Sequence, residues 1–95
     1  MKSKEETIDE VLRRKFGDFV KKQRTKKGWS REAMASAFES QGFSISEQTI
    51  KSYEYGQRIP PLSKLMYICF LLGSKSEESF CKLLNEIFDE IKKSK

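Results

Sequence analysis

The sequence predicts an all-α fold made of five helices. No segment alternates apolar and polar residues over any length, which is the pattern that a half-buried strand requires. Instead, apolar residues recur every three or four positions, as they do along one face of a helix. Glycine and proline fall mainly between these segments, so they mark where the helices begin and end.

The first helix is expected to begin between Ser3 and Thr7, because Thr7 and Glu10 have the spacing of a capping box. Its apolar stripe continues to position 24 and contains Ile8, Leu12, Phe16, Phe19 and Val20. Gly17 costs a helix about 1 kcal/mol relative to alanine, so the sequence allows a break or a kink there. Gly28 ends the helix.

The next two helices follow the same scheme of a serine start and a glycine end. Ser30 is a good N-cap for the second helix, which ends at Gly42. Ser46 caps the third helix, which stops at Gly56.

Pro60 and Pro61 begin the fourth helix, since proline suits a first helical turn and is excluded from the interior. The segment LSKLMYICFLLG is apolar almost all round, which predicts burial on more than one side. Ser74 and Glu77 have capping-box spacing and begin a last helix. Its apolar stripe consists of Phe80, Leu84, Ile87 and Ile91.

The composition is that of one small globular domain of 95 residues, 37% hydrophobic and 35% charged. No apolar run approaches the roughly 20 residues of a membrane span, and the start MKSKEETIDE lacks the apolar core of a signal peptide. We therefore expect a cytoplasmic protein. Cys69 and Cys81 lie in apolar surroundings without a CxxC pair, so both are expected to be buried, reduced thiols.

The formal charge of +5 indicates a polyanionic partner. Basic residues crowd one segment, which contains Lys21, Lys22, Lys26, Lys27 and Arg31. The chain has no histidine, which is the most common general base and metal ligand. It also has no glycine-rich phosphate loop and no nucleophile elbow. We therefore expect no enzyme, no metal site and no cofactor.

Two charged residues fall on the apolar faces of their helices. Arg24 lies four residues after Val20, and Glu54 lies four after Ile50. Because a lone buried charge costs several kcal/mol, we expect Arg24 and Glu54 to pair and to join the first helix to the third. The alternative is that each side chain reaches solvent separately.

Two segments together carry a recognisable combination of motifs, FGDFVKKQRTKKGWSREAMA (16–35) and ISEQTIKSYEYGQRIPPLSKLMYICFLLG (45–73). They contain an arginine four residues before a glycine, a serine-capped second helix, Ile-Ser-x-x-Thr-Ile, Tyr-Glu-x-Gly, and a leucine-rich helix that follows proline. In this combination the chain resembles the phage-repressor and Cro-type helix-turn-helix regulators, the XRE-like family. In that family the arginine and the glutamate form a structural ion pair.

The resemblance implies a repressor-like helix-turn-helix domain over 1–73, with an N-terminally extended first helix. Residues 74–95 are expected to form a C-terminal helix that packs on the domain, dimerises or does both, and to end in a basic tail. The resemblance also implies that the second helix crosses the phosphate backbone while the third enters the major groove of double-stranded DNA. The DNA-binding residues carried over are Arg31, Ser46, Glu47, Gln48, Thr49, Lys51, Ser52 and Arg58.

Within this set, Glu47, Gln48 and Ser52 match the family's usual base-reading positions. Glutamine pairs with adenine, and glutamate accepts a hydrogen bond from the cytosine amine. Lys51 is expected to anchor a phosphate. For Glu47 two interpretations stay open, since it either reads a base or orients Arg31. The alternative for the whole polar face of the third helix is that it is an ordinary solvated surface that binds nothing.

The chain departs from the resembled family in two places. The link from Ala35 to Ile45 is several residues longer than in most members, which we interpret as an extra turn of the second helix with Phe43 packed on the core. The fourth helix also carries Tyr67 and Phe70 at positions that are commonly polar in the family. We expect the C-terminal helix to cover them, either in the same chain or from a second protomer.

The favoured function is a sequence-specific regulator, a repressor, that acts as a homodimer on a palindromic operator. The alternative is a protein-interaction module or antitoxin-type adaptor that grips a partner protein with its apolar C-terminal helix. Binding to a membrane surface is not expected, because the charges of the first helix are mixed.

Overall fold

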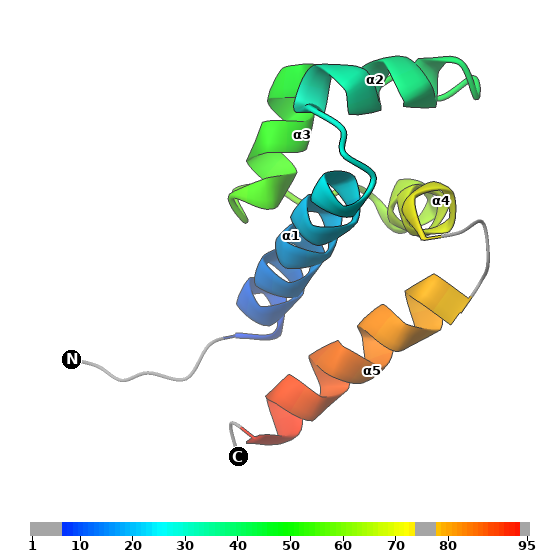
Figure 1. The fold of residues 1–95 in the computed structure, drawn as a ribbon. Helices are drawn as coiled ribbons and strands as arrows, with labels where there is room; N and C mark the ends of the chain where they lie inside the picture. Colours follow the sequence, from blue (N-terminus) through cyan, green and yellow to red (C-terminus); the bar gives the residue numbers. More distant parts are fainter. Residues whose placement is uncertain (1–6, 74–77, 94–95) are drawn as a thin grey trace.

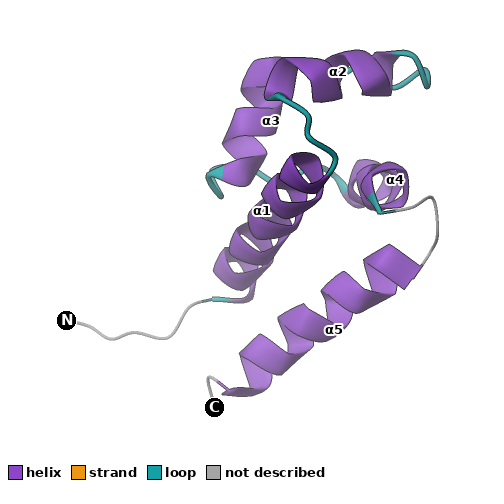
Figure 2. Ribbon diagram, in the orientation of Figure 1, coloured by secondary structure: helices purple, strands orange, loops and turns teal. Residues whose placement is uncertain are grey.

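The computed structural model describes residues 7–73 and 78–93, and within the second range the side chains from residue 81. It contains five helices, which are α1 (Ile8–Lys26), α2 (Arg31–Glu39), α3 (Glu47–Glu54), α4 (Leu62–Leu72) and α5 (Glu78–Lys93). No strand occurs in the described ranges (Figure 2), so the predicted all-α class is confirmed. No helix within these ranges is long and apolar enough to cross a membrane.

The helix starts agree with the sequence signals. Thr7 and Glu10 form the predicted capping box, in which each side chain bonds the backbone N–H of the other residue. The hydroxyl oxygens of Ser30 and Ser46 accept the N–H groups of Ala33 and Thr49, each at 3.0 Å. These bonds satisfy donors that the first turn of a helix leaves unpaired. The proposed start at Ser74 and Glu77 lies outside the described residues.

The long link after α2 closes as a Schellman turn rather than as an extra turn of helix, because α2 ends at Glu39. The N–H of Phe43 donates to the carbonyl of Phe38 at 3.0 Å, and Gly42 takes up a φ of 84°, a region that L side chains rarely adopt. Phe43 packs on the core as expected. Its ring lies edge-on to Phe38, with centroids 5.6 Å apart, and stacks on Tyr67 at 5.3 Å.

Helix α1 contacts α3, α4 and α5, and lies between α3 and α5 in Figure 1. The helix runs without a break through Gly17, which is buried where α1 crosses α3. A Cβ at Gly17 would lie only 2.4 Å from the carbonyl oxygen of Tyr53. The glycine therefore permits a close approach of two helices, and any larger residue must push α3 away. The fully buried side chains of the core include Phe16, Val20, Met34, Phe38, Ile50 and Ile68.

Helix α5 packs against α1 and α4 of its own chain. Its Leu83 and Ile87 are buried, Leu84 and Ile91 are half-buried, and the side chain of Phe80 lies outside the described residues. Glu90 adds ion pairs to Arg14 at 3.2 Å and to Lys15 at 3.9 Å. The apolar stripe of α5 is thus largely used within the chain.

Two expectations about this region are wrong for the single chain. Helix α5 of the same chain does not cover Tyr67 and Phe70, which are 39% and 40% exposed, so only cover by a second protomer stays a prediction. Cys81 is exposed, since it lies on the opposite face of α5 from Leu83. Cys69 is buried as predicted, and burial raises the pKa of its thiol to about 12.

Candidate nucleic-acid interface

The outward face of α3 carries three exposed polar residues, Glu47, Gln48 and Lys51. The opposite face is fixed in the core by Ile50 and Tyr53, and the ring of Tyr53 packs edge-on to Phe16 at 5.6 Å. Thr49 lies at the border and is half-buried. Because eight residues make little more than two turns, this face presents a short row of side chains on a firmly seated helix.

Ser52 does not share that face, contrary to expectation. It is 7% exposed, and its hydroxyl donates to the carbonyl of Gln48 at 3.2 Å. The reason is that α3 contacts both α1 and α2, so two of its sides are covered. We therefore leave Ser52 out of the interface.

Arg24 and Glu54 form the ion pair expected from their helical positions. The Nε of Arg24 lies 2.5 Å from Oε2 of Glu54, and a second nitrogen lies 3.1 Å from Oε1. The side chain of Glu54 is fully buried, and Arg24 also donates to the carbonyl of Trp29 at 2.8 Å. Forked contacts of this kind fix geometry as well as charge, so the end of α1, the start of α2 and the end of α3 are held together.

Arg31 takes the same carboxylate rather than that of Glu47. Its Nε donates to Oε1 of Glu54 at 3.1 Å, so the interpretation in which Glu47 orients Arg31 is wrong. The guanidinium of Arg31 and the ammonium of Lys51 each lie 5.7 Å from the ring centroid of Tyr55. The exposed ring of Tyr55 therefore contacts one basic residue of α2 and one of α3. Tyr55 is not among the residues predicted from the sequence, although it stands four residues after Lys51.

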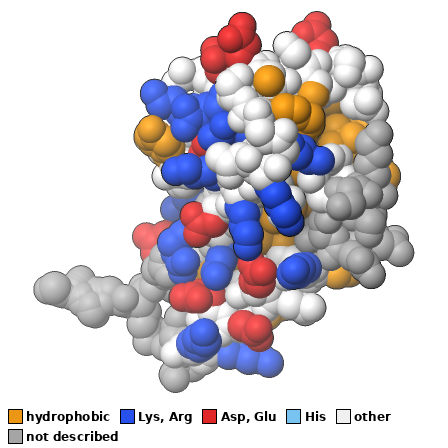
Figure 3. All heavy atoms as spheres, in the orientation of Figure 1, with side chains coloured by type: hydrophobic (Ala, Val, Ile, Leu, Met, Phe, Trp, Pro, Cys, Tyr) orange, Lys and Arg blue, Asp and Glu red, His pale blue; other side chains and the backbone are white. Residues whose placement is uncertain are grey.

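Basic side chains gather over α3 and the neighbouring end of α1 on the face shown in Figure 3. Arg24 and Arg31 share a single carboxylate, that of Glu54. Lys51 adds a third positive charge beside Tyr55. This cluster therefore keeps a net positive charge next to the exposed row of α3, which suits a polyanion.

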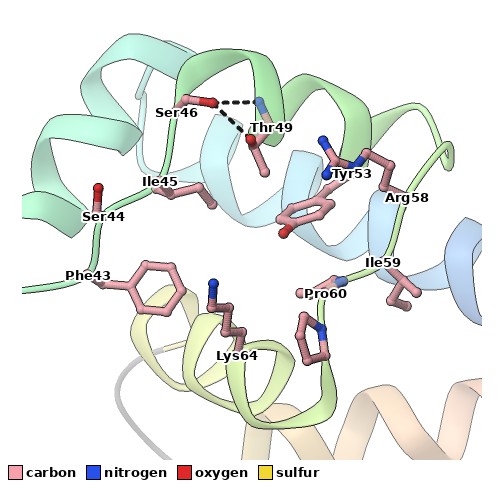
Figure 4. A pocket seen from close by; sticks show the side chains of 11 residues that line it. Phe43, Ser44, Ile45, Ser46, Thr49, Tyr53, Arg58, Ile59, Pro60 and Lys64 are labelled. Carbon is pink, nitrogen blue, oxygen red and sulfur yellow. Dashed lines mark hydrogen bonds between the residues drawn. The ribbon is translucent and has the colours of Figure 1, made fainter.

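Arg58 is exposed in the turn after α3, close to Tyr53 (Figure 4). Burial raises the pKa of Tyr53, and the charge of Arg58 opposes that rise. Below this turn, a cleft of about 400 Å³ opens between loop 43–46, α3 and the start of α4. Ser46 at its rim donates to the hydroxyl of Thr49 at 2.8 Å.

A family model described as helix-turn-helix matches residues 20–78, more than half of the chain. The chain belongs to the XRE-like helix-turn-helix family. This family is a DNA-binding regulatory domain rather than a family of enzymes, and it implies binding to double-stranded DNA. No curated protein and no solved structure is similar enough to the chain to count as a match.

The family match covers the middle of the helix-turn-helix chain and leaves both ends outside it. It begins at Val20, in the second half of α1, and takes in α2, α3 and α4. The first half of α1 and nearly all of α5 lie outside it, and these two segments pack on each other. In the described part of the chain, no group of three acidic, cysteine or histidine side chains is placed to hold a metal ion.

Proposed function

We propose that this protein is a sequence-specific regulator, a repressor, that inserts α3 into the major groove of double-stranded DNA. The observation that carries the proposal is the exposed row of Glu47, Gln48 and Lys51 on a helix locked by the Arg24–Glu54 pair. A recognition helix must hold its side chains in a fixed register to discriminate between base edges.

The residues divide by chemistry. Gln48 is able to pair bidentately with adenine, and Glu47 accepts from the amine of cytosine. Arg31 and Lys51 bind phosphates on either side of Tyr55, while Ser46 and Arg58 contact the backbone near the start of α3 and the following turn. Thr49 lies at the border between the two groups.

We further propose that the protein acts as a homodimer on a palindromic operator, with two α3 helices roughly 34–36 Å apart. Leu83 and Ile87 of α5 are already buried within the chain, which favours a dimer contact on another helix. Helix α4 instead exposes Leu62, Met66 and Phe70 at intervals of four residues, with exposed fractions of 67%, 45% and 40%. Because Lys64 is the only charged residue of α4, two chains of net charge +5 are able to meet there without facing many like charges.

The same exposed face would serve an adaptor that binds another protein. Light scattering during size exclusion separates the two functions. A dimer of the isolated chain supports the DNA-binding homodimer, whereas a monomer that is stable only with a co-purifying protein supports the adaptor.

The experiment that tests DNA binding is a titration of fluorescent duplexes at several salt concentrations. Each phosphate that the protein neutralises should contribute about −0.9 to the slope of log affinity against log salt. A steep slope is expected. An affinity that is indifferent to salt contradicts the proposal.

A further inference from the structure

The cleft below α3 has the chemistry of an anion site. Its lining includes two cationic side chains, Arg58 and Lys64, and among the described residues that line it none is acidic. Four hydroxyl groups share the lining, those of Ser44, Ser46, Thr49 and Tyr53. The nearby carboxylate of Glu54 is fully buried and is occupied by Arg24 and Arg31, so it does not neutralise this charge.

Figure 4 shows the amine of Lys64 reaching from α4 into the cleft and the hydroxyl of Tyr53 pointing down toward it from α3. Within the described part of the chain, the ammonium group of Lys64 makes no hydrogen bond and no ion pair. An ammonium group directed into a hollow without a carboxylate needs water or a bound anion to satisfy its three donors.

Two of these hydroxyl groups, those of Thr49 and Tyr53, are able to donate to a ligand. Thr49 accepts the proton of Ser46 at 2.8 Å, so the proton of Thr49 itself is free for a ligand. A tyrosine phenol is protonated at neutral pH, and burial, which raises the pKa of Tyr53, acts in the same direction, so this hydroxyl is able to donate as well. The cleft thus offers two neutral donors from α3 and positive charge from α4 and the turn after α3.

We propose that this cleft binds a phosphate group, which Lys64 and Arg58 neutralise and which Thr49 and Tyr53 hold by hydrogen bonds. A phosphate presents several acceptor oxygens, which matches this number of donors better than a carboxylate does. The group has two possible sources, a backbone phosphate of DNA or a free phosphate. The DNA source rests on the proposed function, since the cleft adjoins Ser46 and Thr49 at the start of α3.

The test compares Lys64→Gln and Tyr53→Phe with Lys92→Gln, which removes an exposed lysine at the far end of α5. DNA affinity is measured over a range of salt concentrations. Lys64→Gln should reduce the magnitude of the salt slope by about 0.9, the loss of one phosphate contact. Tyr53→Phe should weaken binding severalfold at an unchanged slope, because it removes a neutral donor. Lys92→Gln should change neither quantity.

A second arm identifies the source of the phosphate. Inorganic phosphate is titrated into each protein while the amide resonances of Thr49 and Lys64 are followed by NMR. Shifts that saturate in the parent and vanish in Lys64→Gln support a free phosphate. A reduced DNA slope without such shifts assigns the site to the DNA backbone.

The cleft proposal is overturned if Lys64→Gln leaves both the DNA slope and the phosphate titration unchanged. That result leaves DNA binding by α3 intact if the parent still prefers one sequence. Conversely, phosphate binding that depends on Lys64 in a protein that binds no duplex supports the cleft and rejects the proposed function.

Discussion

Arg31 donates from its Nε to Oε1 of Glu54 at 3.1 Å, and this contact ties the first residue of α2 to the last residue of α3. Arg24 holds the other oxygen of the same carboxylate from α1. One buried acid therefore sets the mutual placement of three helices. The same carboxylate also places a basic residue of α2, Arg31, beside the exposed face of α3.

Replacing Glu54 by glutamine should lower the free energy of unfolding by about 3–5 kcal/mol, because two guanidinium groups lose their shared buried partner. Urea denaturation measures the effect. Glu47→Gln is the matched control, since it removes an exposed acid from the same helix and should change stability by less than about 0.5 kcal/mol. Equal midpoints for the two variants would mean that the ion pair contributes nothing.

Gly17→Ala should also destabilise the fold, by about 1–3 kcal/mol, since the new methyl group meets the carbonyl oxygen of Tyr53. Helix propensity alone predicts a gain of about 1 kcal/mol, so the two accounts differ in sign. Asp18→Ala, at the exposed neighbouring position, controls for propensity and should be close to neutral or stabilising. A urea midpoint that is higher for Gly17→Ala than for the parent would disprove the close approach of α1 and α3.

Met66→Glu should dissociate the proposed dimer, because it places a charge of like sign on both copies in the middle of the α4 face. The expected rise in the dimer dissociation constant is at least about tenfold, or about 1.4 kcal/mol. Sedimentation equilibrium measures it, and Phe88→Glu, at an exposed position of α5, is the control. Dimerisation that survives Met66→Glu but is lost in Phe88→Glu would place the contact on α5 instead.

The two cysteines should differ in reactivity. A thiol-alkylating reagent should modify exposed Cys81 in the folded protein and buried Cys69 only after unfolding, as mass spectrometry of timed samples will show. Modification of both at the same rate in native buffer would contradict the burial of Cys69.

The raised pKa of Cys69 also predicts a pH dependence. Its pKa rises from 9.0 to about 12 on folding, so the unfolded chain loses this proton first as pH increases. The stability difference between the parent and Cys69→Ala should be constant below about pH 9 and should shrink between about pH 9 and 12. Urea denaturation across this range measures it, and a constant difference would show that the thiol titrates normally.

Much of this structure follows from local sequence signals. Thr7, Ser30 and Ser46 mark helix starts because a side-chain oxygen there satisfies backbone donors, and this requirement is local. The Arg24–Glu54 pair was also predictable, because a charge on an apolar helix face needs a partner of opposite sign.

The features that could not be predicted from the sequence depend on contacts between helices. From the sequence, Gly17 appears only as a residue that weakens its helix. Its function, to permit close packing, depends on the backbone of α3 that lies against it. Ser52 looked exposed on a helical wheel, but the wheel does not include the second neighbour, α2. The shared use of Glu54 by Arg31 and the cleft at Lys64 likewise depend on how separate segments come together.

The most direct test of the central claim, that α3 reads DNA sequence, is selection of bound duplexes from a random pool by the parent and by Gln48→Ala. The parent should enrich a palindromic motif, and the variant should lose preference at one position of each half-site. Enrichment of no motif by the parent would contradict the account.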